Sequence, residues 1–201
     1  AALDADLGVG HGDRVAFLGF NNPEMIALLF ACARVGAILV PLNWRLAEPE
    51  HRRMLEDCAP SVLLAEAEFV DHVDSIKDAV PEMRCVGLGD AAAGWLAYEA
   101  LGQGGGGPAP QGAYPDPLLI CYTSGATGAP KGTVLTQSVL LWNAVNSTHL
   151  NDLTSADHVL TTLPLFHVGG LNMQTLPALH AGATVTLQRT FDVDAMFDAI
   201  E

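Results

Sequence analysis

The first half of the chain alternates short apolar runs with longer segments of helical spacing. A run of apolar residues bounded by turn residues predicts a buried strand. From Asn22 to Gly36 the chain has a capping asparagine, Pro23 at the first helical position and a terminal glycine, so it predicts a helix ending at about Val35. Strands predicted in this half are Val15–Phe20, Ala37–Val40, Ser61–Ala65 and Arg84–Gly87, and further helical segments are Glu48–Cys58, Phe69–Val80 and Trp95–Leu101.

The second half continues the alternation with wider spacing. Its predicted strands are Leu118–Cys121, Val134–Leu135, His158–Leu163 and Ala183–Leu187. Its predicted helices are Thr136–Asn151, Gly170–Ala181, which contains Pro177, and an amphipathic segment from Asp192 to Glu201. Repeated strand–helix–strand units indicate an α/β fold with mostly parallel sheets covered by helices. The run Val62-Leu63-Leu64 is apolar on both faces, as expected for a central strand covered on two sides.

A glycine- and proline-rich stretch separates the two halves. The sequence GQGGGGPAPQG at 102–112 formally contains G-x-G-x-x-G, but no strand precedes it and Pro108 and Pro110 prevent a helix from following. It is therefore not a dinucleotide fingerprint. We expect a flexible linker at 102–117 between a first α/β portion, 1–101, and a second portion, 118–201.

Composition limits the class of protein. With 201 residues, 50% hydrophobic and 16% charged, the chain can bury a sizeable core and forms one domain or part of one. A formal net charge of -14 gives no indication that the chain binds nucleic acid or an anionic membrane. The most apolar window, Met25–Leu42, is interrupted by Arg34, Gly36 and Pro41, which suits a buried helix and strand better than a membrane span.

The cysteines and most histidines show no ligand spacing. Cys32, Cys58, Cys85 and Cys121 are dispersed in apolar contexts, which indicates reduced, buried thiols. With no basic-then-apolar leader at the first residues, we expect a cytoplasmic protein. No protein-only metal site is predicted from His11, His51, His72, His149, His158 and His180.

The stretch YTSGATGAPKGTVLT, at 122–136, has the composition of a phosphate cradle. Gly125, Gly128 and Gly132 allow positive φ and close backbone approach, and Lys131 supplies a positive charge. A Gly/Ser/Thr-rich surface turn is the alternative, but such a turn does not require a lysine between a proline and a glycine. Because Pro130 precedes Lys131, the stretch also differs from the Walker A pattern, in which a glycine precedes the lysine.

YTSGATGAPKG resembles the phosphate-loop signature of the adenylate-forming enzymes, which comprise acyl-CoA synthetases, adenylation domains of peptide synthetases and luciferases. Two further stretches agree with that resemblance: NNPEMIALLFACARVGAILVPLN upstream, and LPLFHVGGLN downstream, which is similar to the substrate-side motif of acyl-CoA synthetases. The resemblance covers the whole chain and implies part of the large N-terminal domain of such an enzyme.

The resemblance also implies roles for individual residues. The β- and γ-phosphates of ATP would be held while a carboxylate attacks the α-phosphorus, and the residues concerned are Thr123, Ser124, Gly125, Thr127, Gly128 and Lys131. Ala126 stands where the family usually has another hydroxyl, so one donor is missing. His167 would lie beside the acyl carboxylate, with Gly169 and Gly170 leaving room for the substrate. Phe166, Leu171 and Met173 either line an acyl pocket or belong to the ordinary core.

Several family elements cannot be located in the sequence: the Tyr-Gly-x-Thr-Glu stretch, the ribose aspartate, the hinge and the catalytic lysine of the small C-terminal domain. We therefore expect an N-terminal fragment of an ATP-dependent acyl-CoA synthetase, inactive alone, whose Mg²⁺ ligands lie mostly outside this chain. The acid, of fatty or aryl type, stays open. Two alternatives also stay open: an adenylation domain that loads a carrier protein instead of CoA, and a non-catalytic nucleotide- or anion-binding module.

Overall fold

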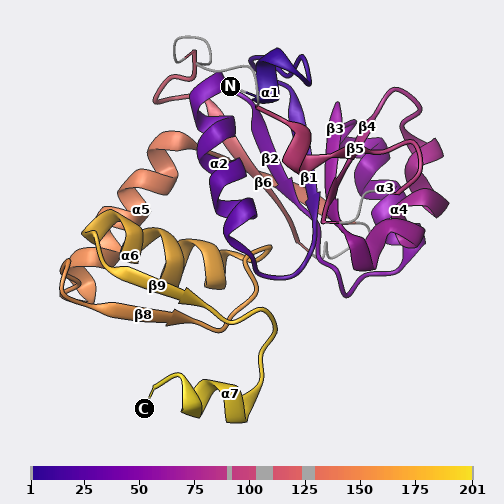
Figure 1. Ribbon diagram of the computed structural model, residues 1–201. Helices are drawn as coiled ribbons and strands as arrows, with labels where there is room; N and C mark the ends of the chain where they lie inside the picture. The colour runs from indigo at the N-terminus through magenta and orange to yellow at the C-terminus, as the bar shows by residue number, and fades with distance from the viewer. Residues whose placement is uncertain (1, 90–91, 103–110, 124–129, 201) are drawn as a thin grey trace.

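The computed structural model describes residues 2–89, 92–102, 111–123 and 130–200. Its main feature is a seven-stranded sheet with the strand order β5-β4-β3-β1-β2-β6-β7 (Figure 1). Every neighbouring pair in this sheet is parallel except β6 and β7. The strands are β1 Arg14–Leu18, β2 Ile38–Pro41, β3 Val62–Glu66, β4 Arg84–Leu88, β5 Leu96–Ala97, β6 Pro117–Thr123 and β7 Lys131–Thr136.

Helices cover both faces of this sheet, and successive strand residues feed two separate cores. In β1, Val15 and Phe17 enter the core formed with α1 (Ala2–Ala5) and α2 (Pro23–Val35). Ala16 and Leu18 enter the core formed with α3 (Glu48–Cys58) and α4 (Val70–Ile76). This alternation explains why the central residues of these parallel strands are apolar on both faces, and it confirms the predicted α/β class.

The helix α2 has the bounds that its local sequence predicts. The side chain of Asn22 accepts a hydrogen bond of 2.9 Å from the Met25 N–H, which satisfies one of the free amides of the first turn. Gly36 ends the helix with φ of 79° and donates its N–H to the carbonyl of Cys32. Local capping chemistry alone is therefore sufficient to define this helix.

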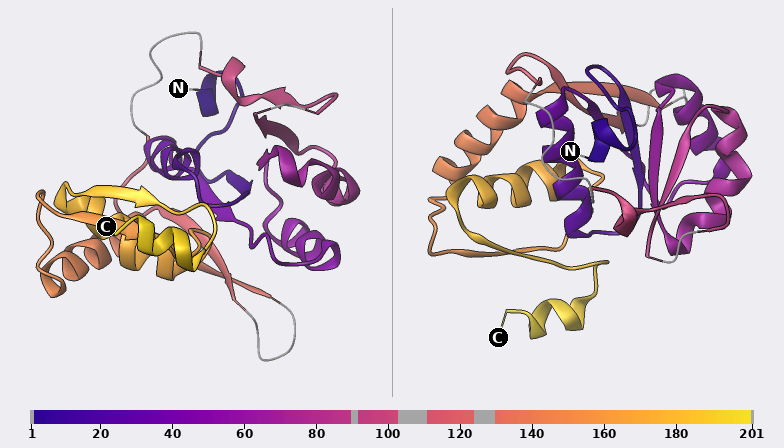
Figure 2. Two further views of the ribbon diagram at one scale, coloured as in Figure 1. Left: turned by 60° about the horizontal axis from the view of Figure 1, so that its bottom comes forward. Right: turned by 45° about the horizontal axis from the view of Figure 1, so that its top comes forward.

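The second half forms a smaller unit beside the sheet. Strands β8 (His158–Thr161) and β9 (Thr184–Leu187) make a separate two-stranded parallel sheet. No other described strand pairs with the outer edge of either. The helices are α5 Gln137–Leu150, α6 Leu176–Ala181 and α7 Val193–Asp198, and a π-helix precedes α6 at Gly169–Thr175. The strand pair lies alongside α5 and α6, while α7 is set apart from the rest (Figure 1 and the right view of Figure 2).

The structure corrects the prediction of one α-helix over Gly170–Ala181. The first part is a π-helix, in which the Leu176 N–H donates to the Leu171 carbonyl five residues earlier. Pro177 has no N–H and cannot complete the four-residue ladder, and the wider turn accommodates this break. The α-helix proper begins only at Leu176.

Other boundaries also differ from the sequence pattern. The strand predicted at Val134–Leu135 extends over Lys131–Thr136, because the whole segment pairs with β6. The amphipathic segment at 69–80 contains only the short α4, between 3-10 turns at Ala67–Phe69 and Lys77–Ala79. The helical turn predicted at 95–101 is a two-residue strand, β5, followed by the 3-10 turn Tyr98–Ala100.

Most of the predicted linker core, 103–110, lies outside the described residues. In its described part, the N–H groups of Gln111 and Gly112 donate to the carbonyl of Arg34 at the end of α2. Division of the chain at this stretch stays a prediction. Over the described residues, no helix is long and apolar enough to cross a bilayer.

All four cysteines are free thiols, and Cys85 is only partly buried, whereas the other three are buried. Burial raises the pKa of Cys32 to about 12 and that of Cys121 to about 11. Thiols of this kind are poor nucleophiles at neutral pH. The cysteines therefore belong to the packing of the two cores.

Candidate functional site

The predicted phosphate loop closes a β-hairpin. Strands β6 and β7 run antiparallel, and their register places Thr123 directly opposite Lys131. Side chains of directly opposed residues lie on the same face of a sheet, with Cβ atoms about 5 Å apart. The pairing therefore brings the first hydroxyl and the lysine of the sequence motif together at the mouth of the loop.

Thr123 and Lys131 are both exposed. Among the ion pairs of the described residues, none involves Lys131. A hydroxyl donor and an ammonium group on one face suit an anionic ligand. The other residues assigned to the phosphates lie outside the described part of the chain: Ser124, Gly125, Thr127 and Gly128, together with Ala126.

Gly132 has a different role from the one expected. It lies within β7, and it is not among the described glycines that have positive φ. A side-chain carbon on Gly132 would lie 2.8 Å from the Cγ2 atom of Ile120 on β6. Gly132 is therefore required for close packing across the hairpin rather than for a left-handed turn.

A cavity of about 360 Å³ joins the hairpin to the segment that carries His167. Thr123 and Pro130, which flank the undescribed part of the loop, line one side of it, and Phe166 and His167 line another. The remaining wall comes from the region after β2 and from α3 and β6: Pro41, Asn43, Leu46, Glu50, Met54 and Tyr122. One residue assigned by the sequence to phosphate, Thr123, and one assigned to the acid, His167, thus line the same cavity. Lys131, Gly169 and Gly170 are not among its lining residues.

The wall of this cavity is fixed by polar contacts. The hydroxyl of Tyr122 donates to Asp57 at 2.5 Å and lies 3.3 Å from the carbonyl of Met54, so β6 is tied to α3. Burial, followed by the bond to Asp57, raises the pKa of Tyr122, which keeps it neutral. The carboxylate of Glu50 accepts the Ala47 N–H at the start of α3. Tyr122 and Glu50 therefore serve as structural wall residues.

The ring of His167, which lines the cavity, has one nitrogen engaged by the backbone. Its Nδ1 atom accepts the Gly169 N–H at 3.1 Å, so the neutral ring carries its proton on Nε2. The backbone N–H of His167 donates to the Pro164 carbonyl at 3.2 Å. Because the side chain is exposed and lines the cavity, the Nε2–H can donate to a carboxylate oxygen there.

The glycines after His167 are buried, and the chain itself fills the space beside them. A side-chain carbon on Gly170 would lie 2.4 Å from the carbonyl oxygens of both Leu163 and Pro164. At Gly169 it would meet the His167 ring at 3.2 Å. Both glycines thus allow tight folding of the segment, and their contact with a substrate stays a prediction.

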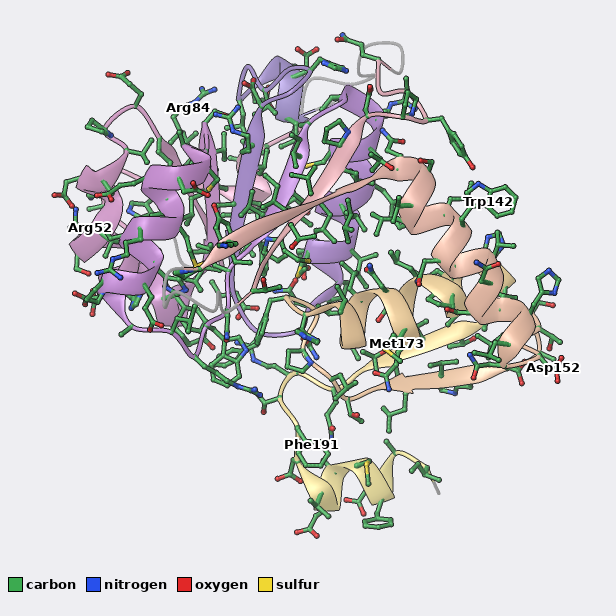
Figure 3. All side chains as sticks on the ribbon, turned by 180° about the vertical axis from the view of Figure 1, so that it is seen from behind. Arg52, Arg84, Trp142, Asp152, Met173 and Phe191 are labelled. Atoms are coloured by element: carbon green, nitrogen blue, oxygen red, sulfur yellow. The ribbon has the colours of Figure 1, made fainter. Side chains whose placement is uncertain are left out.

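The sequence left open whether Phe166, Leu171 and Met173 line an acyl pocket or belong to the core. The structure gives each of them a different environment. Leu171 is 1% exposed and belongs to the core. Phe166 lines the cavity. Met173 is 65% exposed and lies on the outside of the molecule (Figure 3).

Metal ligands are sparse in the described part of the chain, which contains no cluster of three or more His, Cys, Asp or Glu side chains suited to a metal ion. One histidine contact was not apparent from the sequence: Nδ1 of His51 and Nε2 of His72 lie 2.7 Å apart, joining α3 to α4. The described residues therefore supply no such cluster for Mg²⁺ of their own.

Sequence reasoning also missed the wall residues Asn43 and Tyr122. Asn43 lies just beyond β2, at the carboxyl end of a parallel strand, where ligand sites of α/β sheets are usually found. That position is the feature of the sequence by which Asn43 could have been identified. Tyr122 immediately precedes the glycine-rich stretch, and its contact with α3 depends on the fold.

The comparisons with known proteins agree with this geometry. The chain matches the AMP-binding enzyme family over residues 1–201, and it therefore belongs to that family. It is 57% identical over 204 residues to an indoleacetate–CoA ligase of Aromatoleum aromaticum, and 40% identical over 194 residues to a feruloyl-CoA synthase of an Amycolatopsis species. These alignments cover 100% and 96% of this chain but only 40% and 37% of the two relatives.

Solved structures give the same result. A long-chain-fatty-acid CoA ligase from Rhodopseudomonas palustris superposes with a TM-score of 0.91 at 34% identity, over 98% of this chain and 49% of that one. The N-terminal domain of FACL13 from Mycobacterium tuberculosis superposes with a TM-score of 0.83 at 30% identity, over 99% of this chain and 50% of that one. The resemblance to adenylate-forming enzymes and the expected N-terminal-domain fold are confirmed.

Proposed function

We propose that this chain is the phosphate-loop and acid-binding part of an AMP-forming acyl-CoA synthetase. The observation that carries the proposal is the single cavity shared by Thr123 and Pro130, which flank the loop, and by Phe166 and His167. Adenylation of an acid requires a phosphate chain and a carboxylate to be held side by side, and this cavity is lined by residues suited to each.

In the proposed reaction an oxygen of the substrate carboxylate attacks the α-phosphorus of ATP. A bond forms between that oxygen and phosphorus, the bond to the pyrophosphate oxygen breaks, and acyl-AMP and pyrophosphate result. Lys131 and Thr123 would hold the β- and γ-phosphates, with Ser124, Gly125, Thr127 and Gly128 of the loop, and the lysine charge would stabilise the departing pyrophosphate. His167 would orient the carboxylate through its Nε2–H. Mg²⁺ bound to the nucleotide would neutralise further phosphate charge.

In the second half-reaction the thiol of CoA displaces AMP from the acyl-adenylate and forms the thioester. CoA as acceptor is supported by the names of the relatives at 57% and 40% identity. The same names favour an aromatic carboxylic acid as substrate. Because all four cysteines are free thiols, a reducing compartment, the cytoplasm, is the proposed location.

A carrier protein is the second candidate acceptor. It is supported by a relative at 38% identity named a fatty acid–[acyl-carrier-protein] ligase from Streptomyces coeruleorubidus. The deciding experiment supplies a full-length protein containing this chain with ATP, Mg²⁺ and indoleacetate, ferulate or palmitate. Thioester formed on CoA, but not on a phosphopantetheinyl carrier, is the expected result, and the reverse preference would replace CoA by the carrier.

The isolated chain is proposed to be inactive in adenylation. It spans about two fifths of the length of its relatives, and no complete catalytic set is assigned to its residues. Pyrophosphate release by residues 1–201 with the same acids should not exceed the background, whereas clear turnover would contradict this part of the proposal. A native mass near 21.1 kDa in the source cell would instead favour a non-catalytic binding module.

A further inference from the structure

Asn21 connects the large sheet to the small one. It follows β1 and is 7% exposed. Its side-chain amide donates to the carbonyls of Leu163 and Gln188, each at 3.0 Å, and its Oδ1 atom accepts the Leu165 N–H at 2.7 Å. All three of these bonds reach segments more than a hundred residues away, next to β8 and β9.

The contacts of Asn21 continue directly to His167. Leu163 and Leu165, which Asn21 holds, flank Pro164, and the Pro164 carbonyl accepts the backbone N–H of His167. Gly170 lies against the carbonyls of Leu163 and Pro164, so the end of the segment packs on its beginning. Residues 163–170 thus form one compact turn whose first residues are fixed by Asn21.

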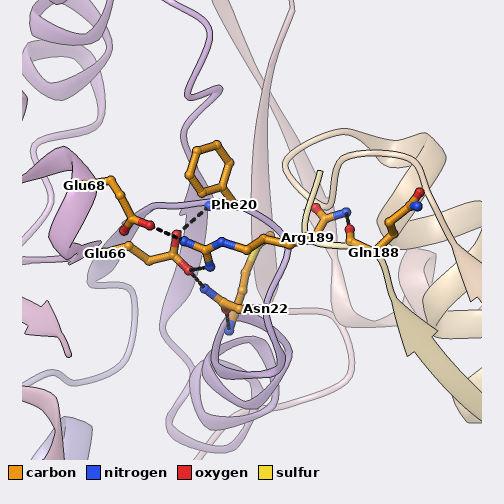
Figure 4. Close-up of polar contacts among 8 residues, drawn as sticks. Phe20, Asn22, Glu66, Glu68, Gln188 and Arg189 are labelled. Carbon is orange, nitrogen blue, oxygen red and sulfur yellow. Dashed lines mark hydrogen bonds and ion pairs between the residues drawn. The ribbon is translucent and has the colours of Figure 1, made fainter. Parts of the chain in front are cut away.

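A second set of contacts holds the other side of the same junction (Figure 4). Arg189, just after β9, donates to the buried carboxylate of Glu66 at 2.9 Å and to Glu68 at 2.5 Å, and its guanidinium lies 4.8 Å from the ring centre of Phe20. Glu66 also accepts from the Phe20 N–H and from the side-chain amide of Asn22. The backbone N–H of Asn21 completes the junction by donating to the Arg189 carbonyl at 3.1 Å.

The position of this junction in the sheet supports a role beyond general stability. β2 and β3 lie on opposite sides of β1, so the carboxyl ends of β1 and β3 form the switch point at which doubly wound sheets usually bind ligands. Here Glu66 and Arg189 occupy that place, and the cavity that contains His167 lies instead beyond β2 and β6. The residues at the switch point therefore hold a segment of the same chain in position.

We infer that Asn21 is a positioning residue for His167. By fixing Leu163 and Leu165, it sets where the His167 ring stands in the cavity and therefore how the acid is held; the part concerning the acid rests on the proposed function. A general contribution to stability is the competing explanation. If Asn21 positions His167, its loss should act locally on residues 163–170 and selectively on the acid. If Asn21 contributes only to general stability, its loss should show neither selectivity.

Amide hydrogen exchange on the 201-residue chain separates the two explanations without any activity. In Asn21→Ala, the amides of Leu165, His167 and Gly169 should exchange about tenfold faster relative to β3, because a lost hydrogen bond of about 1.4 kcal/mol corresponds to that factor. Asn22→Ala is the matched control, since Asn22 is an equally buried neighbouring asparagine that bonds Met25 and Glu66 instead. Its fast exchange should appear at the start of α2 and at the Phe20 N–H that shares Glu66, and 165–169 should exchange as in the wild type. Equal exchange of 165–169 in both variants would overturn the inference.

Kinetics of a full-length protein containing this chain test the consequence for the acid. Asn21→Ala should raise KM for the acid about tenfold, the factor expected for about 1.4 kcal/mol of lost orientation, and leave KM for ATP within about twofold. Asn22→Ala should change neither KM by more than about twofold. A parallel rise of both constants in Asn21→Ala, or no rise, would contradict the positioning role.

Asn21→Asp provides a second variant of nearly the same shape for the case in which Asn21→Ala does not fold. It keeps the acceptor for Leu165 but turns a carboxylate toward the carbonyls of Leu163 and Gln188, so the same local exchange and the same selective rise of KM are expected. If the wild-type protein forms no acyl-adenylate with any acid, the proposed function fails. The exchange experiment still decides the position of the 163–170 segment in that case.

Discussion

Lys131 stands directly opposite Thr123 across the antiparallel pair β6 and β7. Seven residues separate them in the sequence, and the pairing places the two side chains on one face of the hairpin. A shift of the pairing by one residue would send either side chain to the other face. The apolar contacts of Leu119 and Leu135 in the same hairpin fix the register and therefore the geometry of the site.

Replacing Lys131 by alanine should slow acyl-adenylate formation in a full-length protein containing this chain. Removal of one preorganised charge beside the departing pyrophosphate costs about 3 kcal/mol, or roughly 100-fold in rate. ATP–pyrophosphate exchange measures this half-reaction alone. The other lysine of the chain, Lys77, is the matched control because it pairs with Asp74 at the surface. Equal rates in Lys131→Ala and wild type would remove the role assigned to Lys131.

Replacing His167 by alanine should weaken binding of the acid substrate and leave binding of the nucleotide nearly unchanged. Without the Nε2–H donor the carboxylate loses one charge-assisted hydrogen bond of about 2 kcal/mol, so KM for the acid should rise about 30-fold. KM for ATP should stay within about twofold. His149→Ala is the comparison, because His149 is an exposed histidine on α5. A change in KM for ATP as large as that for the acid would place His167 elsewhere in the mechanism.

The His51–His72 contact should make the stability of the chain depend on pH. His51 is 0% exposed, and burial, followed by the repulsion of His72, lowers the pKa of His51 to about 4. The surrounding groups are the ring of His72, the Asn43 carbonyl, which accepts its Nε2–H at 3.0 Å, and the carboxylate of Glu50. An imidazole with an ordinary pKa of about 6.5 in the unfolded chain therefore binds a proton that the folded chain excludes.

Stability from His51 is then fully present above pH 6.5 and falls as the pH decreases from 6.5 toward 4. At pH 5 the loss amounts to about 2 kcal/mol of unfolding free energy. Urea denaturation of the 201-residue chain at pH 7.5 and pH 5.0 measures it. A His51→Gln variant should show a smaller difference between the two pH values, and an identical pH dependence in variant and wild type would contradict the assignment to His51.

The two carboxylates that bind Arg189 should differ in their contribution to stability. Glu66 is 6% exposed, and its removal leaves the Phe20 N–H, the Asn22 amide and part of Arg189 without their acceptor. Arg189 is itself 49% exposed, so the main cost is the buried donors left without an acceptor, and Glu66→Ala should cost about 2 kcal/mol or more. Glu68, with a side chain 54% exposed, binds the same arginine at the surface, so Glu68→Ala should cost less than about 1 kcal/mol.

Chemical denaturation of the two alanine variants measures this difference. Both variants remove one carboxylate from the same arginine, so the net charge of the chain changes equally. A similar loss of unfolding free energy in both would show that the buried position of Glu66 contributes nothing extra.

Features that depend on neighbouring residues were predictable from the sequence. The Asn22 cap, Pro23 and Gly36 define α2, and the apolar runs define the parallel strands because both faces of those strands are covered. The stretch at 122–136 could be singled out because its lysine and its glycines lie close together in the sequence, and its phosphate role stays a prediction. Strands were predicted on both sides of it, but the extension of the second strand back to Lys131 depends on its pairing with β6.

Features that depend on distant contacts were not predictable in this way. Asn21 and Glu66 are ordinary polar residues after strands, and their roles arise from partners more than a hundred residues away. The π-helix is a partial exception: Pro177 indicated a break, but the type of turn depends on how Gly170 packs against Leu163. Local chemistry therefore predicts the elements, and long-range hydrogen bonds place the segment that carries His167.

The two-stranded sheet of β8 and β9 has a practical consequence for handling the protein. Parallel strands are normally found inside larger sheets, yet each of these has one edge that no described strand covers. Such an edge is a template for adding a strand from another molecule. Further along the chain, α7 carries exposed Val193 and Phe197, and Phe191 precedes it. Self-association that increases with concentration is thus the expected behaviour of purified residues 1–201, and light scattering would reveal it before any assay is attempted.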